Sequence, residues 1–359
     1  MFLVGLLLLA SGLYLPIRAA PWVYEDANWL PSVATSATRS LTIPSRTLTT
    51  QTYHWTWEAV GREPALYRVT NLVLHLIAGV LVYGVLAQIV AGGAPLVAAG
   101  IFLLHPLTST VPSYVSARPD AMMTVFVLLA VWLSLQPLRA WRWILIGLAL
   151  TGAAMSKEIG LIGIPLVLLT ILIWRRPLVR QVLCAPLWIA LGALLGALWP
   201  AIRTWMDLNP HLGGSWFSWP DFAVLQVTAA WHILSSLVTL QGFSIDRDTI
   251  GLSQTWTVGA VCMTATAVIA ILLYWRRAPL VTWASAWFLV ALLPRVLFRT
   301  NELLTEPQMY LAVIGPIALI SVGATRLWEW RSRPGHTSHF LAIFLVLWSQ
   351  SGLAQRRPV

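Results

Sequence analysis

The feature that most constrains this sequence is a series of apolar segments of about 17 to 25 residues, separated by polar stretches. A helix of that length crosses the hydrocarbon core of a bilayer, which is about 30 Å thick. Only 10% of the 359 residues are charged and 58% are hydrophobic, whereas a soluble domain has about 25% charged residues. The sequence therefore predicts an all-α polytopic membrane protein, and it excludes a soluble globular domain and a disordered chain.

The apolar segments predict about eleven spanning helices within a single domain, residues 1–359. The first, 2–15, is expected to stay uncleaved, because no basic segment precedes it. The others are expected at 66–90, 95–112, 120–136, 142–156, 158–174, 181–202, 255–275, 279–297, 308–325 and 338–353. Two long polar stretches, 18–64 and 203–254, are expected to form extracytoplasmic loops with interfacial helices.

Arginines at the helix ends decide the predicted orientation. The segment 222–243 contains polar residues such as Gln226 and His232, so we expect it to be interfacial or re-entrant. With that assignment ten arginines face the cytoplasm with the N-terminus, as the positive-inside rule requires, and Glu329 is the single acid among them. Twelve of the thirteen carboxylates then lie on the extracytoplasmic side. The net charge of +10 is split among helix ends, which argues against a nucleic-acid partner.

The first candidate site is the acidic pair Glu25-Asp26, directly after the first helix. Two adjacent carboxylates repel each other, so one of them should have a raised pKa. Such a carboxylate can take a proton from a hydroxyl group or bind a metal ion. The alternative is a solvated loop start flanked by the interface aromatics Trp22 and Trp29.

The second candidate begins at His105-Pro106, where proline should disrupt the predicted helix 95–112. Arg118 and Asp120 then frame the start of the next helix. The guanidinium of Arg118 suits a phosphate oxygen, whereas Asp120 could simply cap that helix.

The third candidate is Lys157-Glu158, which contains the only lysine of the chain. Adjacent residues do not face each other on a helix, so these two are not expected to pair with one another. Lys157 is either an ammonium with a specific role at the outer boundary or half of an anchoring pair.

The fourth candidate is a group of polar residues on both sides of and within the loop 297–308, where charges are unusually dense for this chain. Snorkelling to the membrane interface explains Arg299 better than it explains the acids. The members of this group are Arg295, Arg299, Glu302, Glu306 and Tyr310.

In contrast, His75, inside the predicted helix 66–90, is expected to be a buried hydrogen-bonding residue. The sequence has no glycine-rich phosphate loop and no Cys/His metal spacing.

These stretches, in this order, resemble the GT-C superfamily of polytopic glycosyltransferases. The nearest resemblance is to the transmembrane O-mannosyltransferases that often carry tetratricopeptide repeats. The most specific segment, from His105-Pro106 to Arg118-Pro119-Asp120, is similar to the His-Pro…Gly-Arg-x-Asp signature of that branch. Residues 67–75, Lys157-Glu158, 306–311 and the acidic pair Glu25-Asp26 resemble further motifs. The sequence departs from the family at Thr110, Ala117 and Pro307, where Glu, Gly and Arg are common.

The resemblance implies a GT-C-type bundle that transfers a sugar, mannose by default, from a polyprenyl-phosphate donor to a hydroxyl acceptor with inversion. It implies Asp26 as the base, with Glu25 beside it, and cations at the leaving phosphate. The implied donor-phosphate residues are Arg118, Lys157, Arg295 and Arg299, and the supporting residues are His105, Asp120, Glu158, Glu306, Tyr310 and His75. Surface helices within 30–60 and 203–254 would cover the site. No cofactor is obligatory, although a divalent metal is compatible with the site.

Two alternatives stay open. A transporter or flippase for lipid-linked sugars would also carry a charged cavity, but its ionisable residues should lie near the bilayer midplane. An inactive relative that acts as an assembly partner would explain the departures at Thr110 and Pro307. In each case the lipid bilayer is a partner, and we expect the plasma membrane of a bacterium or archaeon.

Overall fold

A computed structural model describes residues 1–23, 26, 46–137, 139–175, 218–241, 243, 254–297 and 304–332. All regular elements within these ranges are helices. Six of the helices are long and apolar enough to cross a membrane, and a bent pair would make a seventh span. The protein is thus an all-helical integral membrane protein. The predicted helices 181–202 and 338–353 lie outside the described residues, so the count of eleven stays a prediction.

The boundaries follow the apolar segments closely. The first half contains α1 (Phe2–Tyr14), η1 (Leu15–Ala19), α3 (Thr47–Val60), α4 (Pro64–Ile89), α5 (Ala94–Leu104), α6 (Pro106–Ser113), η4 (Val115–Ala117), α7 (Arg118–Leu135) and α8 (Ala140–Ser156). The second half contains η5 (Glu158–Ile162), α9 (Gly163–Trp174), α12 (Trp219–Thr239), α13 (Gln254–Tyr274), α14 (Pro279–Leu297), α15 (Glu306–Met309) and α16 (Ile314–Arg331).

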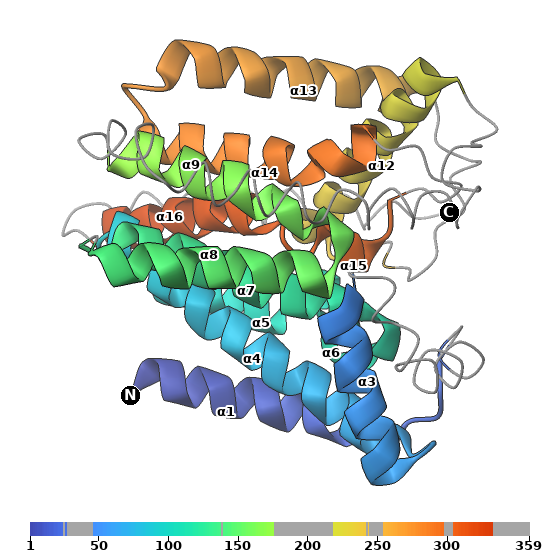
Figure 1. Cartoon of the computed structure of the whole chain (residues 1–359). Coiled ribbons are helices and arrows are strands. Elements are labelled where there is room, and N and C mark those ends of the chain that lie inside the picture. The colour runs from blue at the N-terminus through green and yellow to red at the C-terminus, as the bar shows by residue number, and fades with distance from the viewer. Residues whose placement is uncertain are drawn as a thin grey trace, which may run out of the picture.

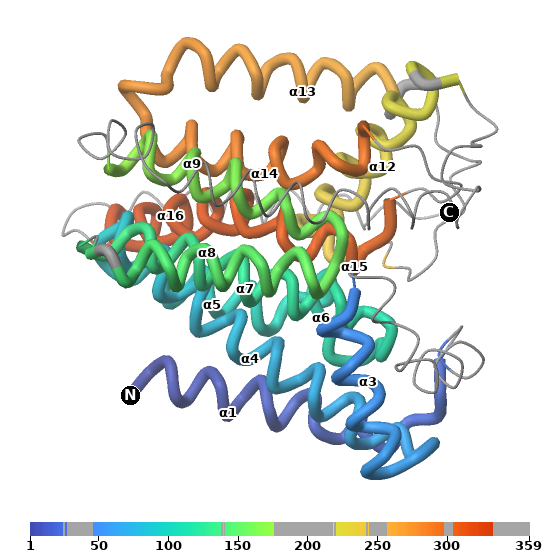
Figure 2. The backbone as a smooth tube through the Cα atoms, viewed as in Figure 1, coloured from blue at the N-terminus to red at the C-terminus, as the bar shows by residue number. Residues whose placement is uncertain are grey.

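Most long helices lie side by side in one direction, and α7 is buried near the centre (Figure 1). By contrast, α3 and α12 run across this direction at one end of the bundle (Figures 1 and 2). The segment 222–243, expected to be interfacial, lies mostly in α12, which is long and apolar enough to be one of the six candidate spans, so the interfacial placement stays a prediction. The last residue of α9 and the first residue of α13 lie at opposite ends of the bundle (Figure 1).

The predicted helix 95–112 is divided in two. Its halves, α5 and α6, meet at His105 with a bend of 56°. Pro106 occupies the first turn of α6, and the Nδ1 atom of His105 accepts a hydrogen bond from the Leu107 amide at 3.0 Å, which caps that helix. The disruption expected at Pro106 is therefore present.

The predicted helix 308–325 begins later than expected. A short helix, α15, comes first and is fixed by a capping box between Thr305 and Gln308. The long helix α16 then starts at Ile314. A Cβ atom on Gly315 would lie 2.2 Å from the Ala284 carbonyl oxygen, so only glycine allows α16 to pack this closely on α14.

The two ends of the bundle differ in charge. Residues 136, 137 and 139, the turn 275–278 and the ends of α9 and α16 lie together at one end, which we call the arginine end (Figure 1). Among the described residues it contains Glu329 as its single acid and seven arginines: Arg139, Arg142, Arg175, Arg276, Arg277, Arg326 and Arg331. The opposite end, where α3 and α12 cross the bundle, is called the charged end because it holds both acids and bases.

Candidate functional site

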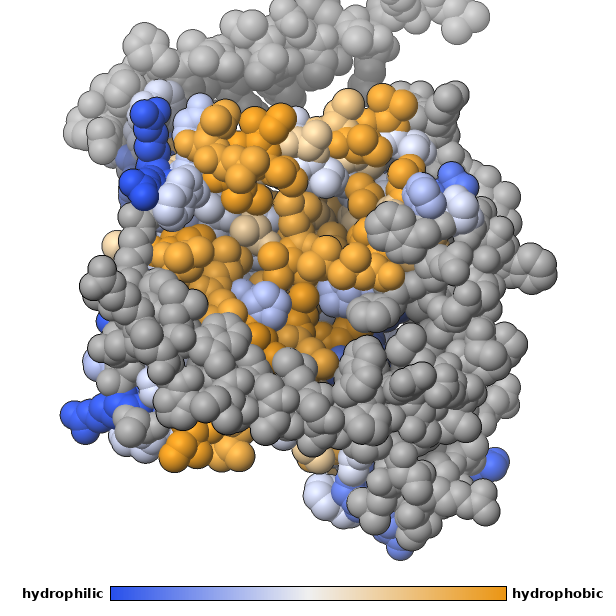
Figure 3. Space-filling view, turned by 45° about the horizontal axis from the view of Figure 1, so that its top comes forward, coloured by the Kyte–Doolittle hydropathy of each residue, from blue (hydrophilic) through white to orange (hydrophobic). Residues whose placement is uncertain are grey.

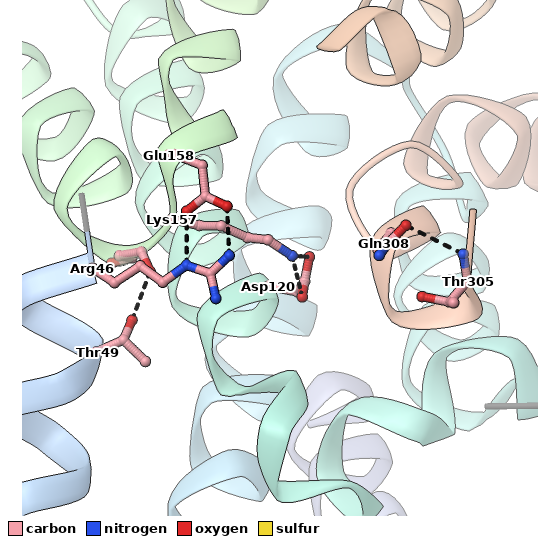
Figure 4. Close-up of polar contacts among 8 residues, drawn as sticks. Arg46, Thr49, Asp120, Lys157, Glu158, Thr305 and Gln308 are labelled. Atoms are coloured by element: carbon pink, nitrogen blue, oxygen red, sulfur yellow. Dashed lines mark hydrogen bonds and ion pairs between the residues drawn. The ribbon is translucent and has the colours of Figure 1, made fainter. Parts of the chain in front are cut away.

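The charged end is built where α3, η4, the first turn of α7 and the α8–η5 junction meet. Figure 4 shows that Lys157 and Glu158 point to different partners, as expected for adjacent residues. A Cβ atom on Gly160 would lie 2.2 Å from the Ala153 carbonyl oxygen. Glycine at 160 therefore lets the chain turn back tightly after α8 and present both charged side chains.

Lys157 forms a buried ion pair with Asp120. Its Nζ atom lies 2.7 Å from both carboxylate oxygens, and the two side chains are only 7% and 6% exposed. Asp120 lies in the first turn of α7, whose N-cap is Ala117, so the alternative role of Asp120 as the cap is not found. Burial lowers the pKa of Lys157, the negative charge of Asp120 opposes this, and the positive charge of Arg295 lowers it further.

Glu158 forms a second ion pair, with Arg46 at the start of α3. Arg46 Nε donates to Glu158 Oε2 at 2.7 Å, and Nη2 donates to Oε1, which makes the contact bidentate. Burial raises the pKa of Glu158, but the charge and hydrogen bonds of Arg46 outweigh it and lower the pKa to about 2. Thr49 donates to the Ser156 carbonyl at 2.8 Å, a second contact between α3 and the end of α8.

The carboxylate of Asp26 is buried against η4. Its Oδ1 atom accepts from the Ser116 amide at 3.0 Å and hydroxyl at 2.6 Å, and Oδ2 accepts from the Val115 amide at 3.1 Å. Burial raises the pKa of Asp26 above its usual 3.8, although these hydrogen bonds oppose the rise. Among the described residues, Oδ2 accepts a single hydrogen bond, from the Val115 amide. A raised pKa is typical of a catalytic base.

Arg118 is fully buried among neutral groups. Its Nε donates to Asn71 Oδ1 at 3.0 Å, and Nη2 donates to the Tyr67 carbonyl at 3.1 Å. Nη1 faces the hydroxyls of Thr52 and Thr56 at 3.3 and 3.4 Å, and the guanidinium lies 4.3 Å from the centre of the Tyr53 ring. With its donors directed to these protein groups, Arg118 holds α3 onto α4 and α7 and is poorly placed to bind a phosphate.

Two of the supporting residues, both histidines, connect helices. His75 Nε2 donates to the Leu103 carbonyl at 3.1 Å, so Nδ1 is the atom that accepts from the Tyr310 hydroxyl at 2.7 Å. His75 is thus the buried hydrogen-bonding residue that the sequence predicts. His105 Nε2 donates to the Leu237 carbonyl at 3.1 Å and ties the α5–α6 break to α12.

Arg295 lies at an apolar cavity of about 220 Å³ between α12, α13 and α14. Gln226, Thr264 and Arg295 are polar residues in its lining, but its surface is almost entirely apolar and includes Trp231 and Phe288. Figure 3 turns this side of the molecule forward and shows apolar side chains around a hollow. The cavity thus has room for part of a lipid chain, with a cation in its lining.

Of the remaining candidates, one is described by the structure and three are not. Glu306 is buried at the start of α15. Glu25, Arg299 and Glu302 lie outside the described residues. Within the described part of the chain, no three His, Cys, Asp or Glu side chains gather into a group that could hold a metal ion.

Three important residues were not singled out by the sequence reasoning: Arg46, Tyr53 and Arg68. The Tyr53 hydroxyl donates to the Val115 carbonyl at 2.8 Å, so α3 contacts the same segment as Asp26. A signal existed for Arg68, because it is the only charged residue in α4, and a charge inside an apolar helix usually has a specific partner. Arg46 and Tyr53 lie in a polar stretch where no such contrast marks them.

No protein-family model matches this sequence, and neither a curated protein nor a solved structure shows detectable similarity to it.

Proposed function

We propose that the protein is a membrane glycosyltransferase. It moves a sugar, mannose by default, from a polyprenyl-phosphate donor to a hydroxyl acceptor at the extracytoplasmic face of a bacterial or archaeal plasma membrane. One observation carries the proposal: buried acids and bases gather at one end of an apolar bundle, beside an apolar cavity that contains Arg295. A lipid-linked sugar needs both surroundings, because its chain is apolar and its leaving group is a phosphate.

The donor phosphate is best assigned to Arg295, because Arg295 lines the cavity where the isoprenoid chain would lie and its charge acts on Lys157. Lys157 lies against Asp120, and Arg118 lies against neutral protein groups. Arg295 would contact the phosphate oxygens, with Arg299 as a second ligand, while Lys157 and Arg118 contribute through their charge.

Asp26 is the proposed base, with Glu25 as its neighbour. The acceptor oxygen forms a bond to the anomeric carbon while the bond from that carbon to the phosphate oxygen breaks, which inverts the configuration. The hydroxyl proton passes to Oδ2 of Asp26, and the electron pair of the broken bond leaves on the polyprenyl phosphate. The burial that raises the pKa of Asp26 makes its carboxylate a stronger base than an exposed one.

A carrier for lipid-linked sugars receives less support. A carrier should hold ionisable residues near the bilayer midplane, whereas Asp26, Asp120 and Lys157 lie at one end. The described titratable group deep in α4 is His75, and both of its ring nitrogens are engaged in hydrogen bonds.

The test is sugar transfer by the purified protein in lipid nanodiscs, with labelled polyprenyl-phosphate mannose and a panel of hydroxyl acceptors. We expect transfer by the wild type and a loss of about 100-fold or more in Asp26→Asn. Glu58→Gln is the matched control, because Glu58 is an exposed acid on α3. Full activity in Asp26→Asn would overturn the assignment of the base. Movement of the intact donor across a membrane without transfer would favour the carrier instead.

A further inference from the structure

Arg68 is a buried cation that the proposed reaction does not use. It lies in the second turn of α4, where the residue is 2% exposed and is the only charge of the helix. Among the described residues no carboxylate lies within salt-bridge distance of its guanidinium. Keeping a cation buried without such a partner is costly, so its hydrogen bonds must matter to the fold or to the site.

The guanidinium of Arg68 binds carbonyl groups from two separate segments. On one side it donates to the carbonyls of Arg18, Ala20 and Pro21, with Nη1 3.4 Å from the Arg18 oxygen. On the other side its Nε donates to the Ser113 carbonyl at 3.2 Å. The first segment leads along the chain to Asp26, and the second leads to η4.

These two segments meet at the Asp26 carboxylate. The segment 18–23 approaches it from the N-terminal side, and the Asp26 amide donates to the Val23 carbonyl at 3.2 Å. The other segment supplies the amides of Val115 and Ser116, which bind the carboxylate oxygens. The Arg68 side chain therefore contacts both of the segments that surround the Asp26 carboxylate.

We infer that Arg68 is the positioning residue for Asp26: by binding the 18–21 carbonyls and the Ser113 carbonyl at once, it fixes the carboxylate against η4. Four carbonyls at different angles require a planar group with five N–H donors, which arginine supplies and lysine does not. The positive charge of Arg68 also favours the ionised form of Asp26, although burial, the larger effect, raises the pKa of that carboxyl.

Hydrogen exchange of the full-length protein in nanodiscs tests this geometry without any activity. In Arg68→Met, we expect amide exchange to quicken on the order of tenfold in both 18–23 and 113–117, because both segments lose their shared donor. Exchange in α8 and α9 should stay unchanged. Arg62→Met is the matched control, because Arg62 is an exposed arginine six positions earlier. If Arg68→Met does not fold, Arg68→Lys takes its place and should show the same pattern more weakly. Unchanged exchange in either segment would overturn the inference.

The catalytic consequence rests on the proposed function and has its own measurement. In the transfer assay we expect Arg68→Lys to lower kcat on the order of tenfold with little change in the donor KM, because the base is misplaced while the donor cavity is intact. A higher KM with unchanged kcat would contradict a positioning role. If the wild type transfers no sugar but the exchange pattern is as expected, the proposed function fails and the tie between Arg68 and the Asp26 segment stands.

Discussion

The ammonium of Lys157 lies 2.7 Å from each carboxylate oxygen of Asp120, and both side chains are almost completely buried. The only lysine of the chain therefore forms an ion pair with an acid on α7. This pair links the α8–η5 junction to the first turn of α7, whereas the neighbouring Glu158 links the same junction to α3. Two consecutive residues thus join three elements at the charged end.

Breaking the Lys157–Asp120 pair should destabilise the protein strongly. Lys157→Met leaves a buried carboxylate unpaired, and we expect a loss of about 3–5 kcal/mol in the free energy of unfolding. Asp120→Leu should cost a similar amount, and the double variant should cost clearly less than the two together. Denaturant unfolding in detergent measures the cycle, and Arg277→Met at the exposed arginine end serves as control. Additive costs would show that the two charges do not interact.

The Arg46–Glu158 pair should make stability depend on acidity. The folded-state pKa of Glu158 is about 2, below its usual 4.5, so the pair stabilises the fold above pH 4.5. That contribution is lost progressively as the pH falls from 4.5 towards 2. The Tm difference between the wild type and Glu158→Gln should be constant from pH 6 to pH 8, roughly the working range, and should shrink below pH 4.5. A constant difference at all pH values would exclude the pair as its source.

Replacing Arg118 by lysine should loosen α3. A lysine cannot reach Asn71, the Tyr67 carbonyl and the threonine hydroxyls together, so buried acceptors lose their donors. We expect a loss of about 1–3 kcal/mol in stability and faster proteolysis between α3 and α4. The donor KM in the transfer assay should hardly change. A much higher KM with normal stability would instead place Arg118 at the phosphate, as the sequence motif suggested.

Filling the cavity should weaken donor binding. Leu293→Trp introduces a larger side chain into the lining, and we expect the KM for a long-chain donor to rise on the order of tenfold while kcat is retained. A short-chain donor should be affected less, because less of its chain enters the cavity. Val261→Trp, on the exposed side of α13, is the control. Equal effects on both donors would mean that the chain binds elsewhere.

The membrane helices could be predicted from the sequence because their signal is local. Apolar length defines α4, α7, α13 and α14 within a few residues, and Pro106 marks the break between α5 and α6. The late start of α16 was missed, since it depends on the separate helix α15 and on the packing of Gly315 against α14.

The site could be predicted only in part, because its contacts join distant positions. Asp26, Arg118 and Lys157 were recognised as candidates from the scarcity of charge and from the motifs. Their partners were not, because Asp26 and Ser116 are 90 positions apart and share no periodicity. The surroundings of Arg118 depend on α3, whose placement across the bundle has no counterpart in the composition of that stretch.

The pairing of Arg46 with Glu158 has a consequence for biosynthesis. The two residues are separated by 112 positions, so a nascent chain that has inserted its helices only through α7 does not yet contain the acid that fixes the start of α3. The N-terminal helices are synthesised first, and the start of α3, the helix whose Tyr53 contacts the Val115 carbonyl, is fixed only after translation has passed η5.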